Sequence, residues 1–228
     1  MTAVAATAGV AAYLDARFHL SKDISSIISA RKTEQLIPNA VLNKRESLLN
    51  FFLDQVALMP ADEECIWTPQ GSLTWQETYE MAARYASFLR EELGVAQDEL
   101  VGFYLTNGVP YVVSLLATWG IGTAPAQLNY NLGGDALLHC VRVAGCKVLL
   151  VDEDVEVQAR IAEVRGKLEE MGIRIVVLDE ARRTQIQARE PLWFTPELRS
   201  NVKITSTLML IYTRSVKVHL IAILLGGN

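Results

Sequence analysis

Short apolar runs alternate with amphipathic stretches over most of the 228-residue chain. Four runs have the length and composition of buried strands: 100–105, 123–126, 147–151 and 173–178. The stretches between them place apolar residues at helical spacing, as over 155–171. Buried strands that are separated by helices favour parallel pairing, with helices covering both faces of the sheet. The pattern therefore predicts an open, mostly parallel α/β sheet flanked by helices, which would bind ligands beyond the C-terminal ends of its strands.

Signals for helix ends sharpen this prediction before the first strand. A helix is predicted over 43–59 and ends at Pro60, because proline cannot continue the hydrogen-bond ladder. A small hairpin follows, with strands at 64–67 and 72–74. Thr74-Trp75-Gln76-Glu77 has the pattern of a capping box, so a helix should begin there. Gly94 supplies its left-handed stop, and further helices are predicted over 110–119 and 135–144.

The chain changes character after the fourth strand. Residues 180–203 are polar and predict a surface connection, which leads into a final strand over 204–212. Beyond Thr213, residues 216–225 are nearly all apolar, interrupted only by Lys217 and His219. We therefore expect three parts: an N-terminal apolar segment and lead-in over 1–42, a partial adenylate-forming domain over 43–213 and a divergent apolar tail over 214–228. The name of the middle part rests on a resemblance given below.

The uncharged residues 1–14 allow two interpretations. They are too short to span a bilayer, and no basic residue precedes them as a secretory signal requires. One interpretation is a frayed or helical terminus. The other is a shallow membrane-surface anchor, with Tyr13, Leu14 and Phe18 inserted and Arg17 and Lys22 near the headgroups.

Charge and cysteine usage exclude several classes of protein. The net charge is −5 and no long basic stripe is visible, which argues against nucleic acid as a partner. Cys65, Cys140 and Cys146 form no CxxC or Cys/His pattern, so we expect buried free thiols in an intracellular, reducing compartment.

Spacing alone identifies no catalytic residue and no metal site. Asp152-Glu153-Asp154 follow a strand, but no histidine or further carboxylate has matching spacing, so a solvated loop that starts the next helix is expected. His139 and Cys140 are helix neighbours that point about 100° apart, which predicts packing residues rather than a nucleophile pair. Gly133-Gly134 and Gly120-x-Gly122 predict a turn and a helix stop, because neither completes a dinucleotide-binding pattern.

Asn129, Tyr130 and Asn131 are candidates for a substrate-crevice loop. They follow a predicted strand at the edge where ligands bind, and two amides and a phenol there could orient a polar group. A turn built from turn-forming residues explains the same three residues at least as well.

A longer stretch around this loop carries a family resemblance. Ala124-Pro125-Ala126-Gln127-Leu128-Asn129-Tyr130-Asn131-Leu132, followed by Ala136-Leu137-Leu138-His139-Cys140, resembles the fatty-acid-transport-protein and very-long-chain acyl-CoA synthetase family. Leu73-Thr74-Trp75 and the stretch from Tyr13 to Phe18 resemble further segments of these AMP-forming adenylating enzymes, and the likeness runs from about Ala12 to Thr213.

The resemblance implies an activity for a full-length member. An acyl carboxylate attacks the α-phosphate of ATP, giving acyl-AMP and pyrophosphate, and CoA then displaces AMP to form a thioester. ATP, Mg²⁺ and CoA are implied as cofactors or cosubstrates, and a fatty acid as the substrate.

The sequence departs from the family where that family has a glycine-rich phosphate loop. Ile211-Tyr212-Thr213 match, but Arg214-Ser215-Val216-Lys217-Val218-His219 replace the rest. No glycine occurs between Arg214 and Leu225, so the small residues that bring backbone amides close to phosphates are missing. Thr213 is the one nucleotide-binding remnant carried over. We therefore expect this chain alone, without that loop and the C-terminal domain, to hold no cofactor and to be inactive.

Two further interpretations remain beside a fragment of an acyl-CoA synthetase. One is a non-catalytic, membrane-associated or partner-binding short isoform, paired with a homologous full-length subunit. The other is a self-contained α/β domain that binds a small molecule. The family resemblance favours an intracellular location, with peripheral attachment at the endoplasmic reticulum, a peroxisome or a lipid droplet.

Overall fold

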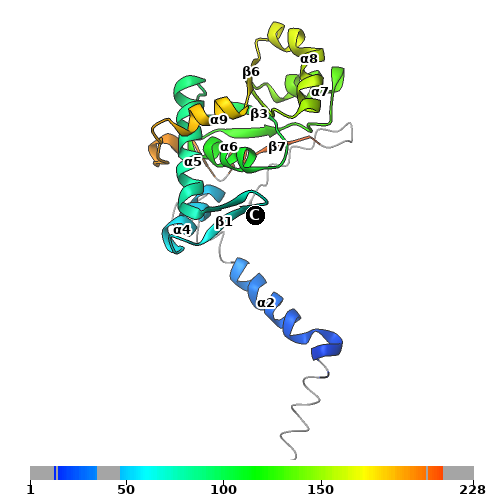
Figure 1. Ribbon diagram of the computed structural model, residues 1–228. Coiled ribbons are helices and arrows are strands. Elements are labelled where there is room, and N and C mark those ends of the chain that lie inside the picture. Colours follow the sequence, from blue (N-terminus) through cyan, green and yellow to red (C-terminus); the bar gives the residue numbers. More distant parts are fainter. Residues whose placement is uncertain (1–12, 14, 35–46, 204, 213–228) are drawn as a thin grey trace, which may run out of the picture. The chain divides into compact units, whose positions relative to one another are not determined.

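The computed structural model describes residues 13, 15–34, 47–203 and 205–212 (Figure 1). The chain divides into two units, Met1–Glu46 and Ser47–Asn228. The first unit contains α2 (Leu20–Glu34), and Tyr13 and Phe18 before it are exposed. The predicted membrane-surface anchor lies largely outside the described residues and stays a prediction, as do the domain boundaries. No helix of the described residues is long and apolar enough to cross a membrane.

A parallel sheet of five strands forms the centre of the second unit, in the order β6-β5-β3-β4-β7. The first four strands of this sheet in chain order are β3 (Leu100–Tyr104), β4 (Ala124–Gln127), β5 (Val148–Val151) and β6 (Arg174–Val177). β3 pairs with β4 on one side and β5 on the other, so that Gly102 lies between Ala126 and Leu149. The predicted α/β class and the four predicted strands are confirmed, and all four belong to one sheet.

Helices cover both faces of this sheet, as the pattern predicted. One core contains α5 (Trp75–Ser87) and α6 (Val109–Gly120), packed on strand residues such as Val101, Phe103 and Leu150. The other contains α7 (Gly134–Ala144) and α8 (Val155–Glu170), packed on residues such as Leu149 and Val151. Successive strand residues point to opposite faces, so each strand serves both cores. Such apolar runs are typical of parallel strands, whose two faces are both buried.

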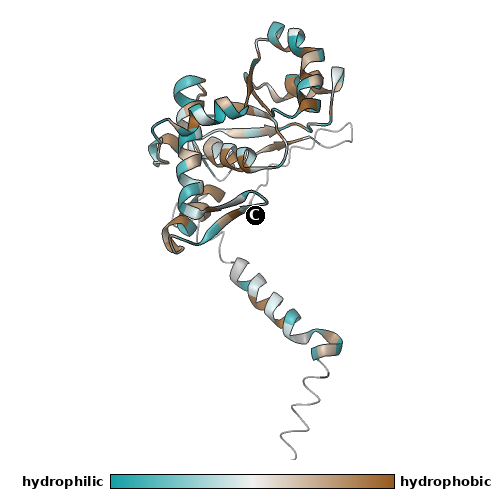
Figure 2. Cartoon of the chain, viewed as in Figure 1, coloured by the Kyte–Doolittle hydropathy of each residue, from teal (hydrophilic) through white to brown (hydrophobic). Residues whose placement is uncertain are grey.

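The segment before the sheet also follows the sequence pattern. It contains α4 (Leu48–Leu58), over much of which Figure 2 shows hydrophobic colour, and an antiparallel hairpin of β1 (Glu64–Thr68) and β2 (Gly71–Thr74). The capping box is confirmed: the Thr74 hydroxyl accepts from the Glu77 amide at 3.2 Å, and the Glu77 carboxylate accepts from the Thr74 amide at 2.8 Å. Beyond α5 the helix widens into a π-helical turn, η1 (Phe88–Glu92), before Gly94 ends it at φ +70°.

The polar segment that precedes the last strand differs from the prediction. It contains a helix, α9 (Glu180–Gln187), and a short 3-10 turn, η2 (Glu197–Arg199), rather than a surface connection alone. Ile186 and Phe194 are buried in the core around α5 and α6, so the segment is part of the fold. Phe194 packs closely against Gly120, where an added Cβ would lie 2.3 Å from the ring.

The predicted strand over 204–212 was too long, because only β7 (Leu210–Ile211) forms. A turn occupies the residues before it, in which the Ser206 amide donates to the Lys203 carbonyl at 2.9 Å. The Ser206 hydroxyl in turn accepts from the Lys203 amide at 2.9 Å. In the register that pairs Ala126 with Leu210 and Gln127 with Ile211, residues 203–206 would lie opposite 119–122, before β4 begins, so β4 offers them no strand partner.

Candidate functional site

The C-terminal edge of the sheet is the predicted place for a ligand. All five strands are parallel, so their C-terminal ends meet there. β3 leads into α6, which packs in one core, whereas the neighbouring β4 leads into α7, which packs in the other. Loops that leave neighbouring strands toward opposite faces open a crevice between them, which is where open α/β sheets bind ligands.

The part of this edge at β3 and β5 is closed by internal hydrogen bonds. The Asp152 carboxylate, just after β5, accepts from the Thr106 hydroxyl at 2.6 Å and from the Thr106 amide at 3.1 Å. Burial opposes ionisation of Asp152, but these bonds and one from the Asp154 amide outweigh it, so the pKa of Asp152 is lowered. The carboxylate therefore stays charged and joins the two strand ends.

The acidic cluster after β5 has the structural role that the sequence predicted. Asp154 caps α8, since its carboxylate accepts from the amides of Glu156 and Val157 at 2.9 and 3.1 Å. Glu153 forms an ion pair with Arg183 at 2.7 Å. The described part of the chain holds no group of three or more His, Cys, Asp or Glu residues that could bind a metal ion.

The part of the edge at β4 and β7 carries polar side chains. The register pairs Gln127 with Ile211, so the segments that follow the two strands leave the sheet side by side. The Gln127 amide donates to the Met209 sulfur at 3.6 Å, and it hydrogen-bonds Tyr111 on α6. Burial raises the pKa of Tyr111, and that hydrogen bond partly offsets the effect. The Trp119 indole donates to the Leu208 carbonyl at 2.8 Å, which fixes the approach to β7.

Gln127 and Tyr111 are site candidates that the sequence analysis did not single out. Gln127 is the polar residue that ends an otherwise apolar strand, and this interruption is a signal that could have identified it. Tyr111 lies in the first turn of α6 and gives no comparable signal, because its place beside Gln127 depends on how α6 packs on the sheet.

The Asn129–Asn131 segment follows β4 at the same edge. The Asn129 side-chain oxygen accepts from the Asn131 amide at 2.9 Å, and the Asn129 carbonyl accepts from the Leu132 amide at 2.9 Å. Arg160 of α8 donates to the Tyr130 carbonyl at 3.0 Å, and the Tyr104 hydroxyl donates to the Leu132 carbonyl. These bonds form the turn that was the alternative interpretation. A role for the segment in orienting a substrate stays a prediction.

Tyr212 is the last described residue of the chain, directly after β7. Its hydroxyl is buried and has no hydrogen-bond partner among the described residues. Burial raises the pKa of Tyr212, and the neighbouring thiols of Cys140 and Cys146 raise it further. Thr213, the predicted nucleotide-binding remnant, lies outside the described residues, and so does the tail over 214–228.

The remaining candidates from the sequence are mostly structural. Cys140 is buried, as expected for a packing residue, but His139 beside it is exposed, because it lies on the outer face of α7. Gly122 and Gly134 have φ values of +73° and +52°, in line with the turn and helix stop predicted around them. Cys140 and Cys146 are buried free thiols, as predicted, whereas Cys65 is a free thiol that is only partly buried, because it lies in the hairpin strand β1.

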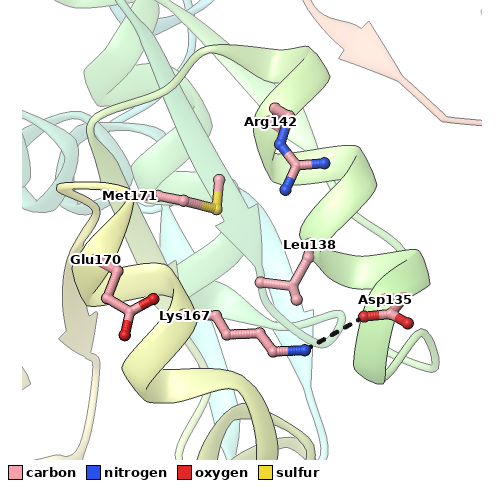
Figure 3. Close-up of a pocket in the computed structure, with 6 residues that line it drawn as sticks. All are labelled: Asp135, Leu138, Arg142, Lys167, Glu170 and Met171. Atoms are coloured by element: carbon pink, nitrogen blue, oxygen red, sulfur yellow. Dashed lines mark hydrogen bonds and ion pairs between the residues drawn. The ribbon is translucent and has the colours of Figure 1, made fainter.

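A hollow of about 610 Å³ lies between α7 and α8, as Figure 3 shows. Leu138 and Met171 contribute apolar surface, while Arg142 and Glu170 add one charge of each sign. The remaining two charges pair with each other, since the Lys167 ammonium lies 3.5 Å from the Asp135 carboxylate. Cations and carboxylates therefore balance, and the hollow shows no convergent set of donors for a phosphate. It is not the crevice predicted at the strand ends.

Comparison with known proteins identifies the family of the chain. A sequence profile described as AMP-binding enzyme matches residues 52–213, which is more than half of the chain. The chain belongs to the AMP-binding enzyme family.

Two relatives of this family member are named as an isopenicillin N epimerase component and as a fatty acid transport protein. It is 35% identical over 192 residues to isopenicillin N epimerase component 1 of Hapsidospora chrysogena, covering 83% of this chain and 31% of the relative. It is 28% identical over 214 residues to a very long-chain fatty acid transport protein of Cochliobolus heterostrophus, covering 92% of this chain and 32% of that protein. The chain thus spans about a third of the length of these relatives.

Solved structures share the fold of this chain. The fatty acyl CoA synthetase of Mycobacterium tuberculosis superposes with a TM-score of 0.62 at 16% identity, covering 72% of this chain and 32% of that one. A benzoate CoA ligase from Burkholderia xenovorans gives a TM-score of 0.60 at 20% identity, with the same two coverages. The predicted family resemblance and the predicted α/β fold are confirmed.

Proposed function

We propose that the protein is an AMP-forming acyl-CoA synthetase that activates long- or very-long-chain fatty acids, and that this chain supplies the N-terminal part of its adenylating domain. The observation that carries the proposal is the family match over 52–213, which contains the parallel sheet. The 28% identity to a very long-chain fatty acid transport protein over 92% of this chain supports the substrate class.

The proposed reaction has two steps. The acyl carboxylate attacks the α-phosphate of ATP, and the bond between the α-phosphorus and the bridging oxygen to the β-phosphate breaks. Pyrophosphate leaves, and acyl-AMP is formed. The CoA thiol then attacks the acyl carbon and expels AMP, which leaves a thioester. The first step concentrates negative charge, so it requires hydrogen-bond donors that are fixed in place around the phosphates.

The described residues do not themselves form a site for the metal ion that accompanies ATP. The Asp152 carboxylate accepts a hydrogen bond from Thr106, and the Asp154 carboxylate caps α8. Glu153 forms an ion pair with Arg183. Since the described ranges hold no group of three suitable ligands, no step is assigned to a metal on these residues. What they provide is the β4–β7 edge, with Gln127 and Tyr111 beside the position where the chain leaves the sheet.

Residues 1–228 on their own are proposed to lack the activity. Directly after Thr213 the sequence reads Arg214-Ser215-Val216-Lys217, without the glycines that let backbone amides reach phosphates. The purified chain should release no pyrophosphate from ATP in response to a fatty acid. Release that depends on fatty acid, in a preparation free of any longer relative, would contradict this proposal. The chain's own role would then be catalytic rather than that of a partner for a homologous full-length subunit.

A second substrate class rests on a separate observation. The 35% identity over 192 residues to isopenicillin N epimerase component 1 exceeds the 28% identity to the fatty acid transport protein. Isopenicillin N carries carboxylic acids, so a peptide-derived carboxylate fits the same adenylating chemistry. A substrate panel that contains both a fatty acid and a peptide-derived acid separates the two classes.

A further inference from the structure

We draw no further inference here: the strongest candidate, the hollow between α7 and α8, carries nothing because Arg142 and Lys167 lie in the last turns of these two helices, where they offset the helix dipoles, and nothing among the described residues shows what would occupy it.

Discussion

Two glycines of the second unit have opposite surroundings. A Cβ at Gly120, the last residue of α6, would lie 2.3 Å from the Phe194 ring, whereas a Cβ at Gly166 in α8 would meet nothing within 4 Å. Gly120→Ala should therefore lower the free energy of unfolding by about 1–3 kcal/mol, the usual cost of overpacking a filled site. Gly166→Ala should raise it by about 0.5–1 kcal/mol, because alanine restricts the unfolded chain and favours the helix.

Chemical denaturation measures the free energy of unfolding of both variants and checks that the two substitutions change it in opposite directions. Phe194→Leu in the Gly120→Ala background should restore part of the loss, since it removes the clashing ring. Equal effects of both alanine substitutions would show that the packing of Phe194 on α6 is wrong.

The lowered pKa of Asp152 predicts a dependence of stability on pH. An unfolded aspartate keeps a pKa near 3.8, and the folded value is lower, mainly because hydrogen bonds from Thr106 overcome the effect of burial. The resulting stabilisation is fully present above the pKa of the unfolded state and is lost as the pH falls through the pKa of the folded state.

Thr106→Val removes the hydroxyl that lies 2.6 Å from the carboxylate, so the variant should lose less stability than the parent between pH 6 and pH 3. Thr106→Ser keeps the hydroxyl and should behave as the parent does. If the free energy of unfolding falls by the same amount in Thr106→Val and in the parent as the pH is lowered, the Thr106 hydroxyl does not lower the pKa of Asp152.

At the scale of elements, strand prediction succeeded where a run is mostly apolar. β3 and β5 are almost fully buried on both faces, and the edge strand β6 contributes apolar residues to both cores although its Arg174 is exposed. The runs at 100–105, 147–151 and 173–178 were therefore placed to within about one residue of these strands. α9 was missed because it contributes one buried side chain, Ile186, and otherwise presents polar residues that resemble a loop. β7 was overextended because the serine and lysine bonds of the turn at 203–206 have no hydrophobic signature.

Charged contacts hold the missed segment in place. Arg189, which follows α9, donates to Glu92 at 2.9 Å, to Glu91 at 3.2 Å and to the Ser87 hydroxyl at 3.2 Å. A network of this kind contributes more than an isolated surface pair. Arg189→Ala should therefore lower the free energy of unfolding by about 1 kcal/mol and speed hydrogen exchange over 180–194.

A matched control for Arg189 exists on α8. Arg165 forms a single exposed pair with Glu169 at 3.8 Å, so Arg165→Ala should change the stability by a few tenths of a kcal/mol at most. If both substitutions have the same effect, the contacts of Arg189 do not anchor α9.

At the scale of the whole molecule, the sequence predicted which segments meet at one edge of the sheet. Asn129–Asn131 and the end of β7 do lie at one sheet edge, because β4 and β7 pair in parallel with Gln127 opposite Ile211. Gln127 and Tyr111 were not foreseen, since their contact depends on how α6 packs on the sheet, which the sequence pattern does not give. The residues that would act at this edge stay a prediction, because Thr213 and the tail over 214–228 lie outside the described residues.

The most direct measurement joins residues 1–213 of this chain to the downstream part of the C. heterostrophus fatty acid transport protein and analyses the adenylate that forms. Mass spectrometry of reactions with ATP and a mixture of long-chain, very-long-chain and peptide-derived acids identifies the product. The account predicts a fatty acyl-AMP from the chimera and none from the 228-residue chain alone. A folded chimera that forms no fatty acyl-AMP, or that adenylates only the peptide-derived acid, would contradict it.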